Sequence, residues 1–548
     1  MACRTDEVPI VAIACTKEAT MTTDSILIAD PLAEAGLQIL RQAGARLHLL
    51  SKEERVQLPE LIKGFDALIV RSATKVDAEL LSSGSRLRVV GRAGIGVDNV
   101  DVGAATERGI LVVNAPTANL VSATEHTFAL LLALLRNVSI AHDSVRAGEW
   151  ERKRFQGVEL QGKTLGIVGL GRIGQSVAVR ARAFGMKVIA FDPFLDASAA
   201  RRIDVEMLPV DEVLASADVV TLHTPLTEQT RNLLDSDRIG VMKKGAYLVN
   251  CARGGIVDEE ALLEALETGQ LAGAALDVFA QEPPQDARLR NHERVVATPH
   301  IGAQTREAQE RVATETARMV LDALAGSLSV TAVNLPFVAA RGVGESFLIL
   351  GEQLGLLASS ILGGSLLEVQ VELWGVEESV RIPVTIAALK GALTAFLGEA
   401  VNFVNAETIA DSRGIEVVRS THHDAGEYPH LVAVRLKGES GEVEVSGTVF
   451  GDSDPRVVQF EGYRLEFSPR GDLLVLRNRD VPGVVGRIGT LLGEAGVNIA
   501  EIHLARHTRE QDAMAVIRLD EAIDAETLQR LVELPEVHRA QMIHLGGF

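Results

Sequence analysis

Three residues in this 548-residue chain have the side-chain types needed to oxidise an alcohol that carries a carboxylate: Arg253, Glu282 and His300. Near neutral pH, a histidine can accept the hydroxyl proton while a hydride leaves the carbon. A neighbouring carboxylate can orient the imidazole and stabilise its charged form. An arginine can hold the substrate carboxylate through paired hydrogen bonds. Together, these three types could carry out the dehydrogenation of a hydroxy acid.

The positions of the three residues favour this interpretation. Each follows an apolar segment that predicts a buried strand, in the stretches VNCARGG, DVFAQEPP and TPHIGAQT. Ligands of open α/β sheets bind beyond the carboxyl ends of the strands, so all three would face one cleft. Taken singly, Arg253 could form a surface ion pair, Glu282 could only precede a turn, and His300 could pack in a loop. Their order on successive strand ends supports the catalytic alternative.

A glycine-rich turn supplies a candidate dinucleotide site. Leu165–Val168 predicts a buried strand, Ile173–Ala183 a helix and Lys187–Phe191 the next strand. The turn between the first strand and the helix has the spacing G-x-G-x-x-G, formed by Gly169, Gly171 and Gly174. Such glycines permit the tight bend, the approach of a pyrophosphate and close helix packing. Asp192 ends the second strand, where a carboxylate binds the ribose and repels a 2′-phosphate, so NAD is predicted rather than NADP. The alternative is a glycine turn in an ordinary α/β domain.

Two further loops were considered as anion sites. The loop Arg92–Gly96 offers an arginine and backbone N–H groups that suit a carboxylate or a phosphate, although it could be a plain glycine turn. Arg71-Ser72, at the end of another predicted strand, could face the same cleft. The stretch Gly157–Thr164 matches the P-loop pattern, but a P-loop must follow a strand and open a helix. Here the pattern leads into a strand, so binding of a nucleoside triphosphate is rejected.

Several predicted elements must position these residues. Parallel strands alternating with short helices indicate a doubly wound sheet. Val121–His142 is expected to form one long helix, on which His126 is a packed or interface residue rather than a catalyst. The helix Ala308–Leu324 should return the chain to the first domain. Residues 341–465 form a separate α/β region, and residues 473–544 have the order β-α-β-β-α-β of a ferredoxin-like fold.

Composition narrows the class of protein. The formal charge of −20 with no basic block argues against binding to nucleic acid or to an anionic membrane. Three cysteines, Cys3, Cys15 and Cys251, fit a reducing cytosol rather than a disulfide framework. The best apolar segment, 347–362, is interrupted by Glu352 and Gln353, so no membrane span is expected. No metal site is predicted.

Six stretches of the chain resemble the D-isomer-specific 2-hydroxyacid dehydrogenase family: GRAGIGVDNVD, GKTLGIVGLGRIG, HTPLTEQTRNLL, NCARGGIVDEEAL, ALDVFAQEPP and TPHIGAQT. They cover about residues 24–335. The resemblance implies that Arg253, Glu282 and His300 are catalytic, and that Asp277 meets the carboxamide side of the nicotinamide. The NAD contacts would be Gly169, Gly171, Arg172, Ile173, Gly174, Asp192, Thr224, Cys251, Ala252, Arg253, Asp277, His300, Ile301, Gly302 and Ala303. The substrate contacts would be Arg71, Ser72, Arg92, Gly94, Ile95, Gly96 and Asn99.

The C-terminal part narrows the resemblance to the long phosphoglycerate dehydrogenases of this family. Residues 341–465, with VNFVNA at 401–406, resemble their intervening domain, and RDVPGVVGRIGTLLGEAGVNIAEI resembles the ACT signature. This implies NAD-dependent oxidation of 3-phospho-D-glycerate to 3-phosphohydroxypyruvate, the first step of L-serine biosynthesis. It also implies a cytoplasmic homo-oligomer, a dimer or a tetramer, with L-serine bound between ACT domains of neighbouring subunits. By position, the effector contacts would be Asn478, Asp480 and Asn498; Asn478 stands where other members have a larger group.

Three alternatives remain open from the sequence. The enzyme could act on another D-2-hydroxy acid. The chain could be a non-enzymatic NAD sensor, since some relatives on this fold are transcriptional co-repressors. The ACT domain could serve only to hold subunits together.

The resemblance implies a definite domain order. A doubly wound Rossmann-type NAD domain is inserted in a flavodoxin-like substrate domain, and an α/β intervening domain and a ferredoxin-like ACT domain follow. The expected bounds are 1–23 for an N-terminal extension, 24–120 and 304–337 for the substrate domain, 121–303 for the NAD domain, 338–466 for the intervening domain and 472–548 for the ACT domain.

Overall fold

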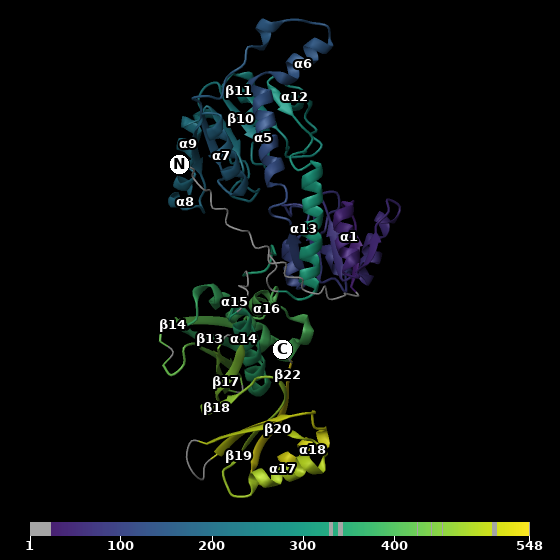
Figure 1. Cartoon of the computed structure of the whole chain (residues 1–548), viewed down its shortest axis with the longest axis vertical. Coiled ribbons are helices and arrows are strands. Elements are labelled where there is room, and N and C mark those ends of the chain that lie inside the picture. The colour runs from purple at the N-terminus through teal and green to yellow at the C-terminus, as the bar shows by residue number, and fades with distance from the viewer. Residues whose placement is uncertain are drawn as a thin grey trace, which may run out of the picture.

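The computed structural model describes residues 24–327, 332–337 and 343–546, apart from residues 425, 440, 452 and 507–511. Four sheets follow one another along an elongated molecule (Figure 1). We call the units built on them the first, second, third and fourth domains, in chain order. The expected N-terminal extension, with Cys3 and Cys15, lies outside the described residues.

The first domain is a parallel five-stranded sheet in the order β2-β1-β3-β4-β5, the flavodoxin-like order. Its strands are β1 (Ser25–Ile28), β2 (Arg46–Leu49), β3 (Ala67–Val70), β4 (Val89–Arg92) and β5 (Leu111–Asn114). Its helices are α1 (Glu34–Gln42), α2 (Leu58–Leu61), α3 (Ala78–Ser83), α4 (Val102–Glu107) and the returning α13 (Arg306–Leu324). The chain therefore leaves this domain after β5 and comes back to it with α13, as expected from the sequence.

The second domain is a parallel seven-stranded sheet in the order β12-β11-β10-β9-β6-β7-β8. Its strands are β6 (Thr164–Val168), β7 (Lys187–Phe191), β8 (Glu206–Met207), β9 (Val219–Leu222), β10 (Ala246–Asn250), β11 (Leu271–Leu276) and β12 (Val295–Ala297). Its helices are α5 (Leu120–Leu135), α6 (Val138–Arg146), α7 (Arg172–Ala183), α8 (Ala197–Arg202), α9 (Val210–Ser216), α10 (Ser236–Val241), α11 (Glu259–Glu267) and α12 (Ala287–Arg290). The strand order reverses beside β6, and ligands of doubly wound sheets bind at such a reversal.

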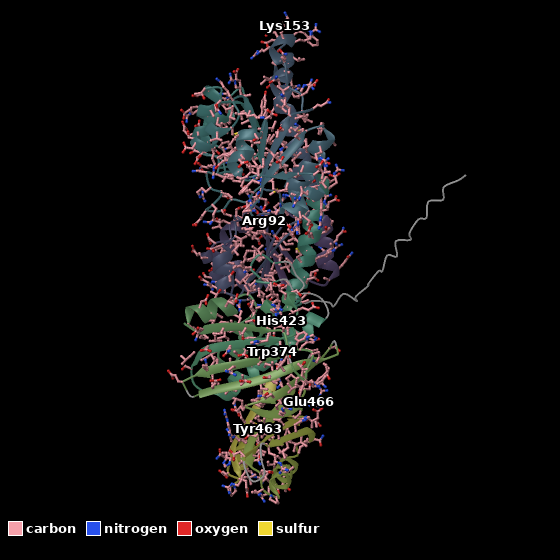
Figure 2. The ribbon with its side chains drawn as sticks, turned by 90° about the vertical axis from the view of Figure 1, so that its left-hand side faces the viewer. Arg92, Lys153, Trp374, His423, Tyr463 and Glu466 are labelled. Carbon is pink, nitrogen blue, oxygen red and sulfur yellow. The ribbon has the colours of Figure 1, made fainter. Side chains whose placement is uncertain are left out.

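The predicted single helix over Val121–His142 is wrong. The chain forms α5 and α6, whose axes differ by 63°. Asn137 adopts a left-handed backbone with φ of 54° at the break, and its side-chain amide donates to the Gln156 carbonyl oxygen at 3.2 Å. Asparagine tolerates this conformation better than most residues, and neither glycine nor proline marks the site. After the bend, α6 projects beyond the sheet. Lys153, which follows α6 in the chain, lies at the tip of this projection (Figure 2).

The third domain packs two long helices against a six-stranded sheet. The helices are α14 (Val343–Leu362) and α15 (Glu378–Leu397), followed by the short α16 (Ala406–Ser412). The sheet order is β14-β13-β15-β16-β17-β18, formed by β13 (Leu366–Trp374), β14 (Glu416–His422), β15 (Leu431–Gly438), β16 (Gly441–Phe450), β17 (Asp454–Phe460) and β18 (Tyr463–Phe467). By length and composition alone, α14 and α15 are each long and apolar enough to cross a membrane. The bent pair α5 and α6 passes the same test if it is taken as one broken span. In the structure, α14 and α15 bury their apolar side chains in the domain core, which accounts for their composition.

The fourth domain has the predicted β-α-β-β-α-β order. Its elements are β19 (Gly471–Arg479), α17 (Val484–Glu494), β20 (Ile499–Arg506), β21 (Asp512–Leu519), α18 (Ala525–Val532) and β22 (Val537–Leu545), with the sheet order β20-β21-β19-β22. One face of this sheet joins the core of the third domain through Val475, Met514 and Ile543. Gln541 and Arg539 also donate to carbonyl oxygens at the end of α14, each at 2.5 Å. The third and fourth domains therefore share one hydrophobic core.

The third domain also contacts the first. The side-chain amide of Asn402, in the VNFVNA stretch, donates to the Gly109 carbonyl oxygen at 2.7 Å. Gly109 has φ of 68°, and a Cβ there would lie 2.5 Å from the Asn402 amide nitrogen and 2.8 Å from that of Asn405. Because Gly109 directly follows α4, the VNFVNA stretch is docked at the end of that helix.

Candidate active site

The three candidate catalytic residues lie in loops that follow three adjacent strands. Arg253 follows β10, Glu282 follows β11 and His300 follows β12, and these strands are neighbours in the sheet. A Cβ on Gly254 would lie 1.8 Å from the Phe279 carbonyl oxygen, so only glycine allows the first two loops to approach this closely. The three loops therefore lie side by side at the carboxyl ends of the strands, as expected.

His300 and Glu282 form a hydrogen-bonded pair. Nδ1 of His300 lies 2.8 Å from Oε2 of Glu282, and both side chains remain partly exposed. The backbone N–H of Phe279 donates to the other carboxylate oxygen at 3.3 Å. An ionised carboxylate can only accept, so Nδ1 carries the proton and Nε2 is left with a lone pair. This arrangement is that of a general base oriented by a carboxylate.

Arg253 is held across the boundary between the first two domains. Its Nε donates to Oδ2 of Asp98 at 3.0 Å, and Nη1 donates to the Ala252 carbonyl oxygen at 2.7 Å. Nη2 takes part in neither contact and lies beside Gly96, where a Cβ would be only 1.9 Å away. Gly96 therefore leaves the space that the guanidinium occupies.

Arg92 occupies the space beside Gly94, just as Arg253 occupies the space beside Gly96. A Cβ on Gly94 would lie 1.5 Å from the Arg92 Nη1. Burial, followed by the positive charges of Arg253 and Arg71, lowers the pKa of Arg92 to about 10, against an opposing contribution from Asp98. Among the described residues, its buried Nε has no hydrogen-bond partner. Arg92 is a protonated, incompletely satisfied cation at neutral pH and lies near the boundary of the first two domains (Figure 2).

The other substrate candidates differ in exposure and contacts. The Asn99 amide donates to the carbonyl oxygens of Arg71 and Thr74, each at 2.6 Å, so it holds their loop in place. The Arg71 backbone N–H donates to Asp30 at 2.7 Å, and Ser72 is exposed. Ile95 accepts a 2.5 Å bond from the Asn114 amide, which fixes the Arg92–Gly96 loop.

The glycine turn has the geometry expected of a dinucleotide site. Gly169 has φ of 95°, and a Cβ on Gly174 would lie 2.2 Å from the Gly169 carbonyl oxygen, whereas Gly171 faces open space. Asp192 accepts from the backbone N–H of Leu170 at 2.8 Å and of Phe194 at 2.9 Å. Arg172 begins α7, and Ile173 follows it. Among the described residues, the buried Thr224 hydroxyl has no partner, so it is available to a ligand. These residues fit NAD.

Asp277 is buried next to this site, and Cys251 is partly buried. Asp277 is 1% exposed and accepts bonds from Thr298 Oγ1 at 2.6 Å, Ile301 N at 2.9 Å and Gly302 N at 2.8 Å. Burial, together with the negative charge of Asp277, raises the pKa of the Cys251 thiol to about 12, so the thiol stays neutral. Ala252 donates to Asn250, and Ala303 accepts from Gln309 at 2.9 Å. The contact of Asp277 with the carboxamide stays a prediction.

The three effector candidates do not converge within one chain. Asn478 and Asp480 lie at the end of β19, where Arg479 is level with Asp512. Asn498 precedes β20, whose first residue pairs with Leu519 at the other end of β21. At ~3.3 Å per residue, the two ends are roughly 23 Å apart. The buried Oδ1 of Asn478 has no partner among the described residues, and Asn498 donates to Asp520 at 2.6 Å. A site using all three needs residues from a second copy.

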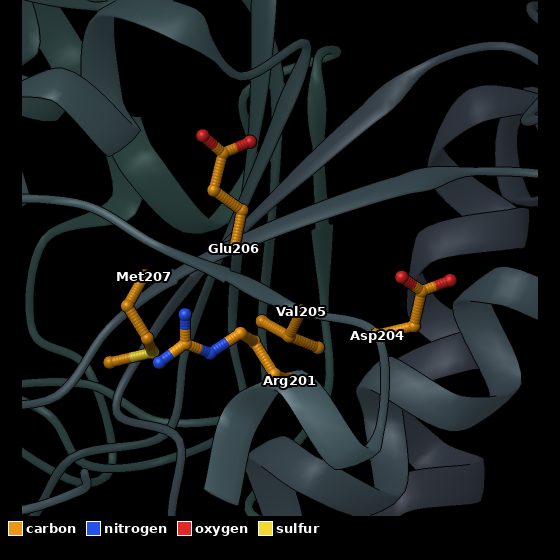
Figure 3. A pocket seen from close by; sticks show the side chains of 5 residues that line it. All are labelled: Arg201, Asp204, Val205, Glu206 and Met207. Atoms are coloured by element: carbon orange, nitrogen blue, oxygen red, sulfur yellow. The ribbon is translucent and has the colours of Figure 1, made fainter. Parts of the chain in front are cut away.

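Sequence reasoning missed two residues that shape the site, Asp98 and Gly254. Asp98 stands beside the predicted Asn99 in GVDNVD and could have been suspected as an arginine partner from that position. Gly254 follows Arg253 directly, and its role depends on a distant loop. Two pockets of the described surface lie away from the residues of the site. One is lined by Arg201, Asp204, Val205, Glu206 and Met207, whose carboxylates point in different directions (Figure 3).

Three segments of the chain match known domain families, and nearly the whole chain matches individual known proteins. The NAD binding domain of the D-isomer specific 2-hydroxyacid dehydrogenases matches residues 128–302, the D-3-phosphoglycerate dehydrogenase intervening domain matches 345–461, and the ACT domain matches 473–536. The D-3-phosphoglycerate dehydrogenase of Methanocaldococcus jannaschii is 39% identical over 525 residues, which span 95% of this chain and 99% of that protein. That of Bacillus subtilis is 40% identical over 523 residues, again 95% and 99%.

A solved structure matches the first two domains. The D-lactate dehydrogenase of Aquifex aeolicus, complexed with NAD and lactic acid, has a TM-score of 0.52 and 29% identity. The match covers 57% of this chain and 99% of that chain. The third and fourth domains therefore account for the difference in length.

Proposed function

The chain belongs to the D-3-phosphoglycerate dehydrogenases, and we propose that Arg253, Glu282 and His300 carry out the reaction of this family in it. The enzyme oxidises 3-phospho-D-glycerate to 3-phosphohydroxypyruvate with NAD, the first step of L-serine biosynthesis. The observation that carries the residue assignment is the 2.8 Å contact between His300 Nδ1 and Glu282 Oε2. It leaves Nε2 of His300 free to accept the proton of the substrate hydroxyl.

The roles of the three residues follow from their contacts. His300 becomes an imidazolium when it accepts the proton, and the Glu282 carboxylate stabilises that charge. Arg253 holds the substrate carboxylate through Nη2 while Nε stays bound to Asp98. Such positioning of the reacting carbon is worth several orders of magnitude in rate. When bound, NAD accepts the hydride that leaves the same carbon.

Three arginines match the charge of a phosphorylated hydroxy acid. Arg253 approaches the Arg92–Gly96 loop closely, and the charges of Arg71, Arg92 and Arg253 influence one another. Placing like charges together without a partner is unfavourable, so an anion with more than one charged group should bind there. We assign the carboxylate to Arg253 and the phosphate to Arg92 and Arg71. Gly94, Ile95, Gly96 and Asn99 would shape the loop around it, with exposed Ser72 at its edge.

The cofactor contacts are proposed at the turn and the strand ends of the second domain. The N-terminus of α7 and the open space at Gly171 would receive the pyrophosphate. Asp192 would receive the ribose hydroxyls, and Thr224 the adjacent polar groups. The remaining proposed contacts are Arg172, Ile173, Cys251, Ala252, Asp277, Ile301, Gly302 and Ala303.

The fourth domain, an ACT domain, is suited to an amino-acid effector. We propose that this effector is L-serine, bound between ACT domains of two subunits of a cytoplasmic dimer or tetramer. The separation of Asn478 and Asp480 from Asn498 supports a site shared by two copies. We also propose that the predicted domain bounds, including 24–120 with 304–337 and 121–303, are the functional units.

An assay of NADH formation across several D-2-hydroxy acids, with and without serine, tests this proposal. We expect the highest kcat/KM for 3-phospho-D-glycerate, and a large loss for D-glycerate and D-lactate, which lack the phosphate. Equal activity on D-glycerate would contradict the phosphate role of Arg92 and Arg71. Unchanged activity at millimolar serine would contradict the effector assignment and leave the catalytic one intact.

A further inference from the structure

His126 has contacts that packing alone does not require. It lies on α5 with its side chain 15% exposed. Its Nε2 is 3.1 Å from Oδ1 of Asp277 and 3.1 Å from Oγ1 of Thr298. Burial acts to raise the pKa of Asp277, but the bonds from His126, Thr298 and the loop N–H groups lower it below the ordinary value of 3.8. Asp277 is therefore a carboxylate, and Nε2 of His126 must donate to it.

Asp277 in turn fixes the loop that carries the general base. Its carboxylate accepts from the N–H groups of Ile301 and Gly302, and its carbonyl oxygen accepts from the His300 N–H at 2.8 Å. His300 itself has φ of 54°, a left-handed conformation that is uncommon for residues other than glycine. Such a backbone persists where the surroundings determine it strongly. Here the bonds to Asp277 are those surroundings.

The loop is also tied to the two segments that connect the first and second domains. The hydroxyl of Ser122, one turn before His126 on α5, donates to the Gly302 carbonyl oxygen at 2.5 Å. Residues four apart lie on the same face of a helix, so α5 holds the loop at two points. On the other side, Gln309 of α13 donates to the Ala303 carbonyl oxygen at 2.9 Å. The His300 loop is thus attached to both connecting helices.

We propose that His126 is a positioning residue for His300. By donating to the buried Asp277 carboxylate, it ties the His300 loop to α5 and keeps Nε2 of His300 directed at the substrate hydroxyl. This inference rests on the proposed role of His300 as general base. Without His126, Oδ1 of Asp277 keeps the bonds from Thr298 and Ile301 but loses the bond that joins it to α5, and the buried negative charge has one donor fewer. The loop would relax, and the proton acceptor would move away from its target.

Pre-steady-state burst kinetics of the full-length enzyme separate this role from a merely structural one. Enzyme saturated with NAD is mixed rapidly with saturating 3-phospho-D-glycerate, and NADH absorbance gives a rate constant and an amplitude. A misplaced base lowers the rate constant, whereas partial unfolding lowers only the amplitude. His126→Leu removes the donor. His126→Gln keeps an N–H at the distance of Nε2, and His126→Asn is polar but too short.

We expect the rate constant of His126→Leu and His126→Asn to fall by roughly 10- to 100-fold, the range for a small misplacement of a catalytic group. His126→Gln should stay within about threefold of the native enzyme, because it restores the donor. NADH binding should be unchanged in all three. Thr124→Val is the matched control, since among the described residues its buried hydroxyl bonds only to the Leu120 carbonyl oxygen of α5, at 2.7 Å, and it should leave the rate constant unchanged.

Three results would overturn the inference: a native rate constant in His126→Leu, a loss confined to the amplitude, or a His126→Gln enzyme no faster than His126→Asn. If His126→Leu fails to fold, the rate constants of His126→Gln and His126→Asn are compared, and this comparison alone tests the inference. His300→Gln in the same assay keeps the two proposals distinct. If it retains a near-native rate constant, the assignment of the base is wrong. If it is inactive while His126→Asn is native, only the positioning role is wrong.

Discussion

A single methyl group at Gly96 should reduce catalysis sharply with little effect on stability. In Gly96→Ala, the new Cβ would lie 1.9 Å from Nη2 and 3.0 Å from Cζ of Arg253, and 2.6 Å from Oδ2 of Asp98. Ordinary contacts begin near 3.5 Å, so the guanidinium must withdraw by about 1.5 Å. Arg253 is the end of a flexible side chain, and Gly96 does not have the left-handed backbone that requires glycine. The fold can therefore accommodate the methyl group by moving the arginine.

The displacement removes Arg253 from its place beside the substrate carboxylate. A misplacement of ~1 Å can reduce the rate about 100-fold, and we expect kcat/KM for 3-phospho-D-glycerate to fall by about that factor. This corresponds to about 2.7 kcal/mol of transition-state stabilisation. Steady-state kinetics measure the loss, while NAD binding and Tm should change little. Gly103→Ala is the control, because the nearest atom to its Cβ is 3.5 Å away.

A double-mutant cycle tests the mechanism of this loss. In an Arg253→Ala background, Gly96→Ala should have almost no further effect, because the side chain that it displaces is absent. An equal loss in both backgrounds would show that the methyl group acts on the loop itself. A kcat/KM within about threefold of the native value would refute the placement of Arg253 in the site.

Four further predictions test the other parts of the molecule. His300→Ala should lower kcat by about 10²–10⁴-fold while NAD titration shows normal binding, and near-normal turnover would contradict its role as base. Asp192→Ala should raise the NADP-to-NAD ratio of kcat/KM, and should lower Tm because the Leu170 and Phe194 N–H groups lose their acceptor. L-serine should inhibit the native enzyme about 5- to 150-fold at saturation, and Asn498→Ala should abolish both the inhibition and calorimetric serine binding. Because the pKa of Asp277 is lower in the folded state, its stabilisation is present above about pH 3.8 and is lost on further acidification; Asp277→Asn should therefore lower Tm at pH 7 but show a smaller drop in Tm on acidification.

The sheets and the turn were predictable because their signals are local. The strand Lys187–Phe191 was predicted to the residue and Leu165–Val168 to within one residue, since a buried parallel strand requires a continuous apolar run. The glycine spacing predicted the close approach at Gly174 for the same reason. By contrast, the bend between α5 and α6 follows from the backbone conformation of Asn137. The pattern of polar and apolar residues continues across the bend and therefore does not reveal it. The start of α7 at Arg172 rather than Ile173 is an ordinary difference at a helix end.

The contacts that complete the site could not be read from spacing. Arg253 and Asp98 are 155 positions apart, and His126 and Asp277 are 151 apart. The prediction that His126 is a packed residue was compatible with its burial but said nothing of its partner. The first pair depends on how the second domain is inserted in the first, and the second pair depends on how α5 packs in its own domain. Asn402 and Gly109 are 293 positions apart, and their contact depends on how the third domain packs against the first.

The shared core of the third and fourth domains has a consequence for the synthesis of the chain. The strands of the third domain are complete at Phe467, yet one face of its core is covered by Ile543 and Leu545 of β22, the last strand of the protein. During translation, the third domain must therefore wait, with apolar side chains in contact with water, until β22 leaves the ribosome. A nascent chain arrested between Phe467 and β22 would present that surface to chaperones or to other nascent chains. The third and fourth domains therefore complete their shared core in one late step of synthesis.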